Sequence, residues 1–220
     1  GINTQALADY SHSEGSGTTV TADGVYAHAE GYGVQVQGIA SHGEGWLTYI
    51  AKTSNYSHVE GYGSQSLSGD YSHAEGYYTT TTGTGSHAQN MGTLASGVAS
   101  HAGGSGTTAG GDYSFVHSYS SQIQGHGTFI PTNGDRSVIL GGTNHIMYGY
   151  NDSHAPSEVR DSIIIGGSGN TITSLAGADV KNTVILGGNG VKASLSNTVY
   201  VPQIVLGTPD FVPTGSTDPR

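Results

Sequence analysis

The sequence predicts an all-β protein, a parallel β-roll or β-solenoid with about 14 residues in each turn. Gly accounts for 37 of the 220 residues and only 10% are charged, so strong helix formers are scarce while Gly, Ser, Thr, Tyr and Val are abundant. A five-residue motif also recurs along the chain, as expected for a repeat architecture. About 14 residues hold two short strands and two tight turns but not a strand and a helix.

The motif reads Ser-His-Ala-Glu-Gly in its most regular form. Its five closest copies begin at Ser11, Ala27, Ser41, Ser57 and Ser72, and looser copies begin at Ser86, Ser100 and Ser114. Successive copies start 16, 14, 16, 15, 14, 14 and 14 residues apart. We therefore expect each motif to form one strand of a coil, with the Gly supplying the turn that follows.

An apolar form of the motif continues the repeat to a total of twelve copies, starting at Ser137, Ser162, Thr183 and Thr198. The spacings widen to 23, 25 and 21 residues before returning to 15, which indicates insertions that form loops on one side of the solenoid. We expect three regions: a polar, His/Glu-rich β-roll over residues 1–118, an apolar β-roll with insertion loops over 119–202, and a Pro-containing extended linker to a further C-terminal domain over 203–220.

Alternation along a strand places the first, third and fifth motif residues on one face and the second and fourth on the other. A narrow coil has room only for small side chains, so Ser, Ala and Gly are expected inside and the larger pair outside. In the apolar motifs this leaves a row of exposed aliphatic side chains, which three chains packed around an axis would bury. The expected apolar trimer core is Val138, Leu140, Ile163, Ile165, Val184 and Leu186. The alternative is a two-sheet monomer with these residues in its interior.

The apolar motifs and their 14-residue spacing resemble the left-handed parallel β-roll head repeats of trimeric autotransporter adhesins of the YadA type, over about residues 10 to 202. The Ser-His-Ala-Glu-Gly-Tyr-Gly form, with Ser-Asn-Thr-Val-Tyr-Val-Pro at 196–202, is more similar to phage tail fibre and virion appendage proteins. These resemblances imply a left-handed homotrimer, intertwined or side by side, that acts in adhesion. No coiled-coil stalk, membrane anchor or trimerisation domain is recognisable in the sequence.

The repeated His and Glu are expected to form a polar core on the trimer axis, in which His donates to Glu of a neighbouring chain and fixes the strand register. The residues of this polar core are His28, Glu30, His42, Glu44, His58, Glu60, His73 and Glu75. Crowded carboxylates are expected to raise the pKa of the His side chains above 6.5. An alternative is an axial row of zinc or nickel sites, with His12, His28, His42, His58, His73, His87 and His101 as ligands. We expect no cofactor.

Aromatic residues recur at two positions around the motif. Tyr10, Tyr26, Tyr56, Tyr71 and Tyr113 precede it, and Tyr32, Trp46, Tyr62, Tyr77, Met91 and Tyr119 follow it. Such rows either stack on one another or offer platforms for sugar rings. The insertion 143–161 is a second candidate recognition surface, because recognition residues concentrate on loops. The candidate receptor contacts are Tyr32, Trp46, Tyr62, Tyr77, Tyr148, Tyr150 and His154.

The function expected is the structural shaft and adhesion module of a trimeric phage tail fibre, located on the virion, which contacts a host cell-surface receptor such as a glycan. The head of a bacterial trimeric adhesin on the cell surface is the alternative, and a polysaccharide-degrading fibre is a lower one, with Asp152, Glu158 and Asp161 as its clustered acids. Repetition argues against an enzyme, because an active site needs one distinctive constellation. A net charge of −10 argues against nucleic acid, and no long apolar run predicts membrane insertion.

Overall fold

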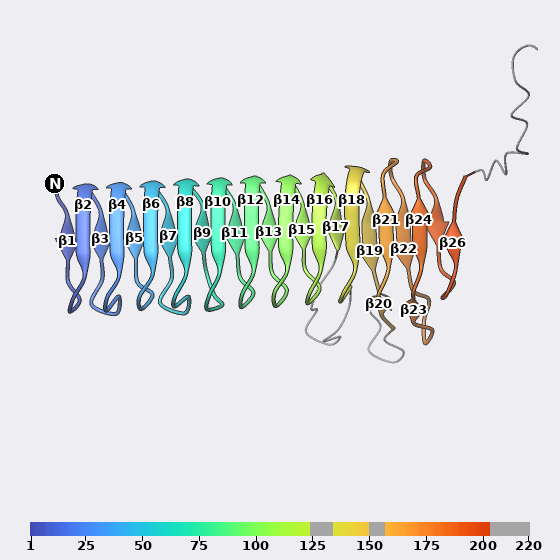
Figure 1. Ribbon diagram of the computed structural model, residues 1–220, viewed down its shortest axis with the longest axis horizontal. Helices are drawn as coiled ribbons and strands as arrows, with labels where there is room; N and C mark the ends of the chain where they lie inside the picture. Colours follow the sequence, from blue (N-terminus) through green and yellow to red (C-terminus); the bar gives the residue numbers. More distant parts are fainter. Residues whose placement is uncertain (124–133, 150–156, 203–220) are drawn as a thin grey trace, which may run out of the picture.

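The fold is an elongated parallel β-solenoid, described for residues 1–123, 134–149 and 157–202 by a computed structural model (Figure 1). Each turn contributes one strand to each of two 12-stranded sheets, and every strand pair within them is parallel. The predicted all-β class, the two strands per turn and the twelve motif strands are therefore confirmed. None of the described residues forms a helix, so this part of the chain has no helix that could cross a membrane.

The first sheet, here called the motif sheet, contains the strands formed by the repeated motif. Its strands are β2 (His12–Ser16), β4 (His28–Tyr32), β6 (His42–Trp46), β8 (His58–Tyr62), β10 (His73–Tyr77), β12 (His87–Met91), β14 (His101–Ser105), β16 (Phe115–Tyr119), β18 (Val138–Thr143), β21 (Ile163–Ile165), β24 (Val184–Leu186) and β26 (Val199–Tyr200). Pairing aligns equivalent motif residues, such as His58 with His73 and Val138 with Ile163. Differences in motif spacing therefore change the length of the segments that connect the strands, not the alignment of the strands themselves.

The second sheet is made of shorter strands that run beneath the motif sheet. They are β1 (Gln5–Ala6), β3 (Thr19–Val20), β5 (Gln35–Val36), β7 (Tyr49–Ile50), β9 (Gln65–Ser66), β11 (Thr80–Thr81), β13 (Leu94–Ala95), β15 (Thr108–Ala109), β17 (Gln122–Ile123), β19 (Ile146–Tyr148), β22 (Thr171–Thr173) and β25 (Lys192–Ala193). Two of the insertions add a small pair, β20 (Val159–Arg160) with β23 (Val180–Lys181), which lies on one side of the solenoid in Figure 1.

The third motif residue faces the interior, as the sequence predicts, but the expectation that interior side chains are small holds only in the polar motifs. The third motif residue is fully buried, as in Ala29, Val59 and Ala74, and it becomes Ile139, Ile164 and Ile185 in the apolar motifs. Apolar residues of the short strands, such as Ile50 and Ile172, face them from the second sheet. The interior is therefore a narrow, dry layer whose side chains become larger toward the C-terminal turns.

The first motif residue is also buried, and its hydroxyl group connects successive turns. The Ser57 amide donates to Ser41 Oγ at 3.1 Å, and the Ser72 amide donates to Ser57 Oγ at 3.2 Å. Ser72 Oγ in turn donates to Ser57 Oγ at 3.1 Å. Buried polar atoms need partners, so this bonding from turn to turn explains how Ser can occupy an interior row.

The fifth motif residue departs from the predicted alternation. Gly45 and Gly61 are exposed, and their φ angles of +104° and +101° take the backbone out of extended geometry. The prediction that this glycine shares the inward face is therefore wrong. A Cβ at Gly61 would overlap the carbonyl oxygen of Gly76 in the next turn, so glycine is required here by close backbone approach as well as by its φ angle.

Candidate functional site

The outward face of the motif sheet carries the His and Glu side chains, here called the His/Glu row: His12, Glu14, His28, Glu30, His42, Glu44, His58, Glu60, His73, Glu75 and His87. The second and fourth residues of each motif point outward, as predicted, because their neighbours in sequence point into the narrow interior. From His28 to His87 the imidazoles are 33% to 40% exposed. The row is thus accessible along one face of the single chain.

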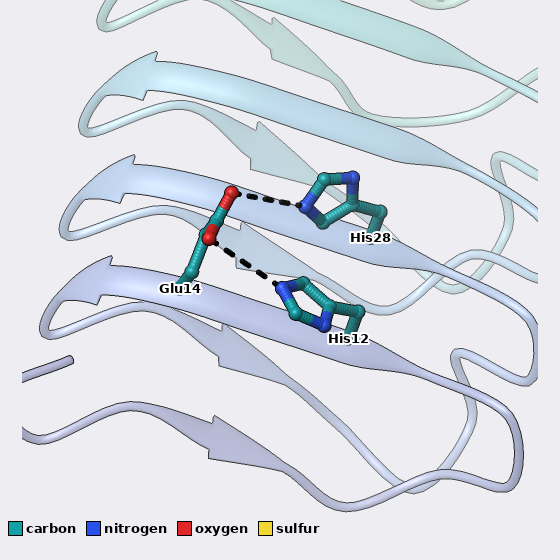
Figure 2. Close-up of side chains that lie close together, drawn as sticks. All are labelled: His12, Glu14 and His28. Atoms are coloured by element: carbon teal, nitrogen blue, oxygen red, sulfur yellow. Dashed lines mark ion pairs between the residues drawn. The ribbon is translucent and has the colours of Figure 1, made fainter.

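Each carboxylate in the row lies within 4 Å of the imidazole of the following turn. Figure 2 shows the first example, in which Glu14 Oε2 lies 3.6 Å from His12 Nε2 and Glu14 Oε1 lies 3.9 Å from His28 Nε2. The contacts that follow are Glu30 with His42 and Glu44 with His58, each with 3.7 Å between the imidazole Nε2 and the carboxylate Oε1. These contacts between imidazoles and carboxylates all lie within one chain. Pairing of His with Glu of a neighbouring chain stays a prediction.

The imidazole rings from His28 to His87 form one stack. His42 and His58 have ring centroids 5.0 Å apart and planes inclined by 2°, and His58 and His73 repeat this arrangement at 4.9 Å and 3°. Further along, His101 stacks on Phe115 at 4.6 Å. The turn-to-turn spacing of a parallel sheet, about 4.8 Å, imposes this distance on every equivalent side chain.

Partial burial and stacking both oppose protonation of the imidazoles, so the prediction of a raised pKa is wrong for His42, His58 and His101. Partial burial lowers the pKa of His42 and His58 below 6.5, and the imidazoles stacked on each of them lower it further. The pKa of His101 is lowered for the same two reasons. Carboxylates act in the opposite direction but more weakly, because each imidazole is closely packed between two others.

The carboxyl groups share protons along the row. Hydrogen bonding to Glu30 and Glu60, with a smaller effect of burial, raises the pKa of Glu44 to about 7. The same bonds lower the pKa of Glu30 and Glu60, which accept them. Glu44 can therefore hold a proton near neutral pH and donate it to one of the two neighbouring carboxylates. A groove of about 480 Å³ runs alongside Glu14, Glu30 and Glu44, over the glycines that follow them.

The aromatic residues that follow the motif align as predicted and stack on each other. Tyr32 and Trp46 have ring centroids 4.2 Å apart, and Tyr62 and Tyr77 are 5.3 Å apart. In the second row, Tyr56 stacks on Tyr71 at 5.1 Å. Because neighbouring turns cover the ring faces, it is mainly ring edges that face solvent, although these side chains remain about half exposed.

The outward aliphatic side chains of the apolar motifs lie where the sequence places them. Leu140, Ile165 and Leu186 are 42% to 43% exposed, and Val138, Ile163 and Val184 are half-buried beside them. The prediction that this pair points outward is confirmed. The alternative, with the pair inside a two-sheet monomer, is wrong, because the intervening Ile139, Ile164 and Ile185 fill the interior.

Only some of the candidate receptor contacts and clustered acids in the first insertion lie within the described residues. Tyr148 is half-buried on β19, whereas Tyr150, His154 and Asp152 lie outside the described residues, as does the expected linker 203–220. Asp161 accepts hydrogen bonds from the Arg136 Nε at 2.6 Å and its Nη2 at 3.0 Å, which lowers the pKa of Asp161. Glu158 pairs with Arg160 at 3.4 Å. These two acids thus face guanidinium groups rather than each other.

His145 is a buried residue that sequence reasoning did not single out for its environment. Its side chain is fully buried, its Nδ1 accepts the Asn170 amide at 3.1 Å, and its Nε2 has no hydrogen-bond partner. Burial lowers its pKa. The signal in the sequence is its position, because His145 and Asn170 continue the row of buried residues that directly precede the short strands and that includes Ser121.

No protein-family model matches the chain, and no curated protein is significantly similar to it.

Proposed function

We propose that this chain is the structural shaft and adhesion module of a homotrimeric surface fibre, of the phage tail fibre kind, without enzymatic activity. Its partners are two further copies of itself and a host cell-surface receptor, with a glycan as the receptor class. Its location is the virion tail fibre, with the bacterial cell surface as the alternative. A parallel solenoid supports the proposal because it is rigid, elongated and able to present equivalent side chains along its length.

The observation that carries the proposal is the aliphatic row on the outer face of the motif sheet. Leu140, Ile165 and Leu186 are aligned by strand pairing and remain 42% to 43% exposed in the single chain. Contiguous apolar patches on soluble proteins mark interaction surfaces. Three copies around one axis would cover the aliphatic row and bring the His/Glu row to the same axis, since both rows lie on one face of one sheet.

The test is the mass of the protein in solution. Multi-angle light scattering should give three times the chain mass of 22.4 kDa. Replacing Leu140, Ile165 and Leu186 together by Ser should shift the mass toward that of a single chain, whereas Leu195→Ser, at a 62% exposed leucine outside the row, should leave the trimer intact. A monomeric unaltered protein would overturn the proposed assembly.

The adhesion part of the proposal rests on the aromatic row of Tyr32, Trp46, Tyr62 and Tyr77, which stays 39% to 51% exposed. Edge-on tyrosines offer hydroxyl groups that can hydrogen-bond to sugars, and aromatic side chains are enriched in binding surfaces. Glycan-array binding that Trp46→Ala weakens and Tyr113→Ala does not would support this surface. Equal binding by both variants would place recognition elsewhere.

The non-enzymatic part of the proposal is tested by incubating the chain with host polysaccharide. Ser57 is buried while His58 points outward, so this neighbouring pair cannot act together as nucleophile and base. We expect no release of reducing sugar ends. Their release, lost on replacing Glu158 by Gln, would favour the polysaccharide-degrading alternative.

A further inference from the structure

Successive turns of the solenoid bring one imidazole nitrogen and two carboxylate oxygens, or the reverse, into small clusters. Four such groups lie on the His/Glu row, and in each the three ligand atoms are within 4.8 Å of one another. They are His12, Glu14 and His28; Glu30, His42 and Glu44; Glu44, His58 and Glu60; and Glu60, His73 and Glu75. Every group is complete within one chain, so no residue of a neighbouring chain is needed to form it.

The imidazole nitrogens in these groups lack hydrogen bonds. The Nε2 atoms of His28, His42, His58 and His73 are buried atoms without a hydrogen-bond partner. Their nearest carboxylate oxygens lie 3.7 to 3.9 Å away, which is too far for a hydrogen bond. Two ligands bound to one ion at about 2.1 Å each are separated by about 3.0 to 4.2 Å, depending on the angle between them. The observed gap therefore has the width of an ion, not of a hydrogen bond.

We propose that the His/Glu row binds divalent transition-metal ions between its turns, at sites made of imidazole nitrogen and carboxylate oxygen. Mixed nitrogen and oxygen ligands suit zinc, nickel and cobalt(II) ions, whereas calcium and magnesium ions prefer oxygen alone. The groove beside Glu14, Glu30 and Glu44 is open, so water can reach these ions and complete their coordination.

Shared ligands limit how many ions bind together. The group around His58 takes Glu44 from one neighbouring group and Glu60 from the other, so it competes with both. The remaining groups, around His28, His42 and His73, have no residue in common. The structure therefore assigns up to three simultaneously filled sites to each chain, at the three groups that share no ligand.

The test is metal stoichiometry in the full chain, produced without a polyhistidine tag and stripped with a chelator. Equilibrium dialysis against nickel(II), followed by elemental analysis, should give about three ions per chain. His42→Gln, His58→Gln and His73→Gln combined should leave about one ion, at His12, Glu14 and His28. The control is His101→Gln with His117→Gln: both imidazoles lie on the same face, but their motifs lack Glu, so about three ions should remain.

A second measurement uses the unaltered protein, in case the triple variant does not fold. Titration with cobalt(II) should produce visible absorption that differs from that of the aqueous ion and disappears on adding a chelator. Circular dichroism of each variant distinguishes lost ligands from lost structure. An unaltered chain that binds no nickel and leaves the cobalt spectrum unchanged would overturn the proposal, as would a folded triple variant that still binds three ions.

Discussion

The backbones of successive turns approach closely at the glycine that ends each motif, so we expect Gly61→Ala to lower the stability of the fold. Gly61 has a φ of +101°, and an added Cβ would overlap the carbonyl oxygen of Gly76 in the next turn. Strain from this φ costs about 1–3 kcal/mol. Displacing the strand also weakens about two hydrogen bonds of the sheet, each worth about 0.5–1.5 kcal/mol. We expect the free energy of unfolding to fall by about 3–5 kcal/mol.

Gly92→Ala is the matched control for this substitution. Gly92 has a φ of +61° and no heavy atom within 4 Å of an added Cβ, so only the backbone strain remains. That strain costs about 1–2 kcal/mol, partly offset by the reduced flexibility of the unfolded chain. Both variants are compared by denaturant unfolding, and hydrogen exchange over residues 58–77 locates the damage. A difference of less than about 1 kcal/mol between the variants would refute the argument from backbone contact.

Three further predictions follow from the packing and charges of the later turns. Because burial lowers the pKa of His145, its contribution to stability is present above pH 6.5 and is lost as the pH falls below that value. The protection factor of amides near Asn170, which corrects the exchange rate for the slower intrinsic exchange at low pH, should therefore fall between pH 7 and pH 5, and an unchanged protection factor would contradict this. Ile164→Ala should cost about 2–4 kcal/mol in chemical denaturation, since its side chain is fully buried. Arg136→Ala, which breaks an exposed ion pair with Asp161, should lower the free energy of unfolding by at most about 1 kcal/mol in the same assay. A larger decrease would contradict the assignment of this contact as an ordinary surface ion pair.

The spacing of the motif copies predicts the period and the strand content, and alternation along each strand predicts the direction of most side chains. Ala29 and Ile164 lie inside, and Leu140 and Ile165 outside, as alternation in a narrow coil requires. The fifth motif residue was misplaced because a φ near +100° is not encoded in an alternating pattern. Trimer contacts and receptor contacts stay predictions.

The charge state of the row could not be derived from composition. Opposite charges in one motif suggested raised His pKa values, but the outcome depends on distances that only the folded chain sets. The ring centroids of His42 and His58 lie 5.0 Å apart, and that neighbour, together with partial burial, outweighs the carboxylates. Likewise, nothing in the motif indicates that Glu44 shares a proton with the carboxyls on both sides, since each copy looks equivalent in sequence.

Register in the motif sheet is conserved from copy to copy: His73 pairs with His87, and His87 pairs with His101. Fourteen residues separate these positions, so deleting residues 87–100 would join Ser86 to His101 and restore a complete motif. The neighbouring turns would meet with the same rows still aligned, and the solenoid would shorten by about 4.8 Å. Duplication would lengthen it by the same step. The length of the solenoid can therefore evolve by gain or loss of single repeats, without any other turn having to adapt.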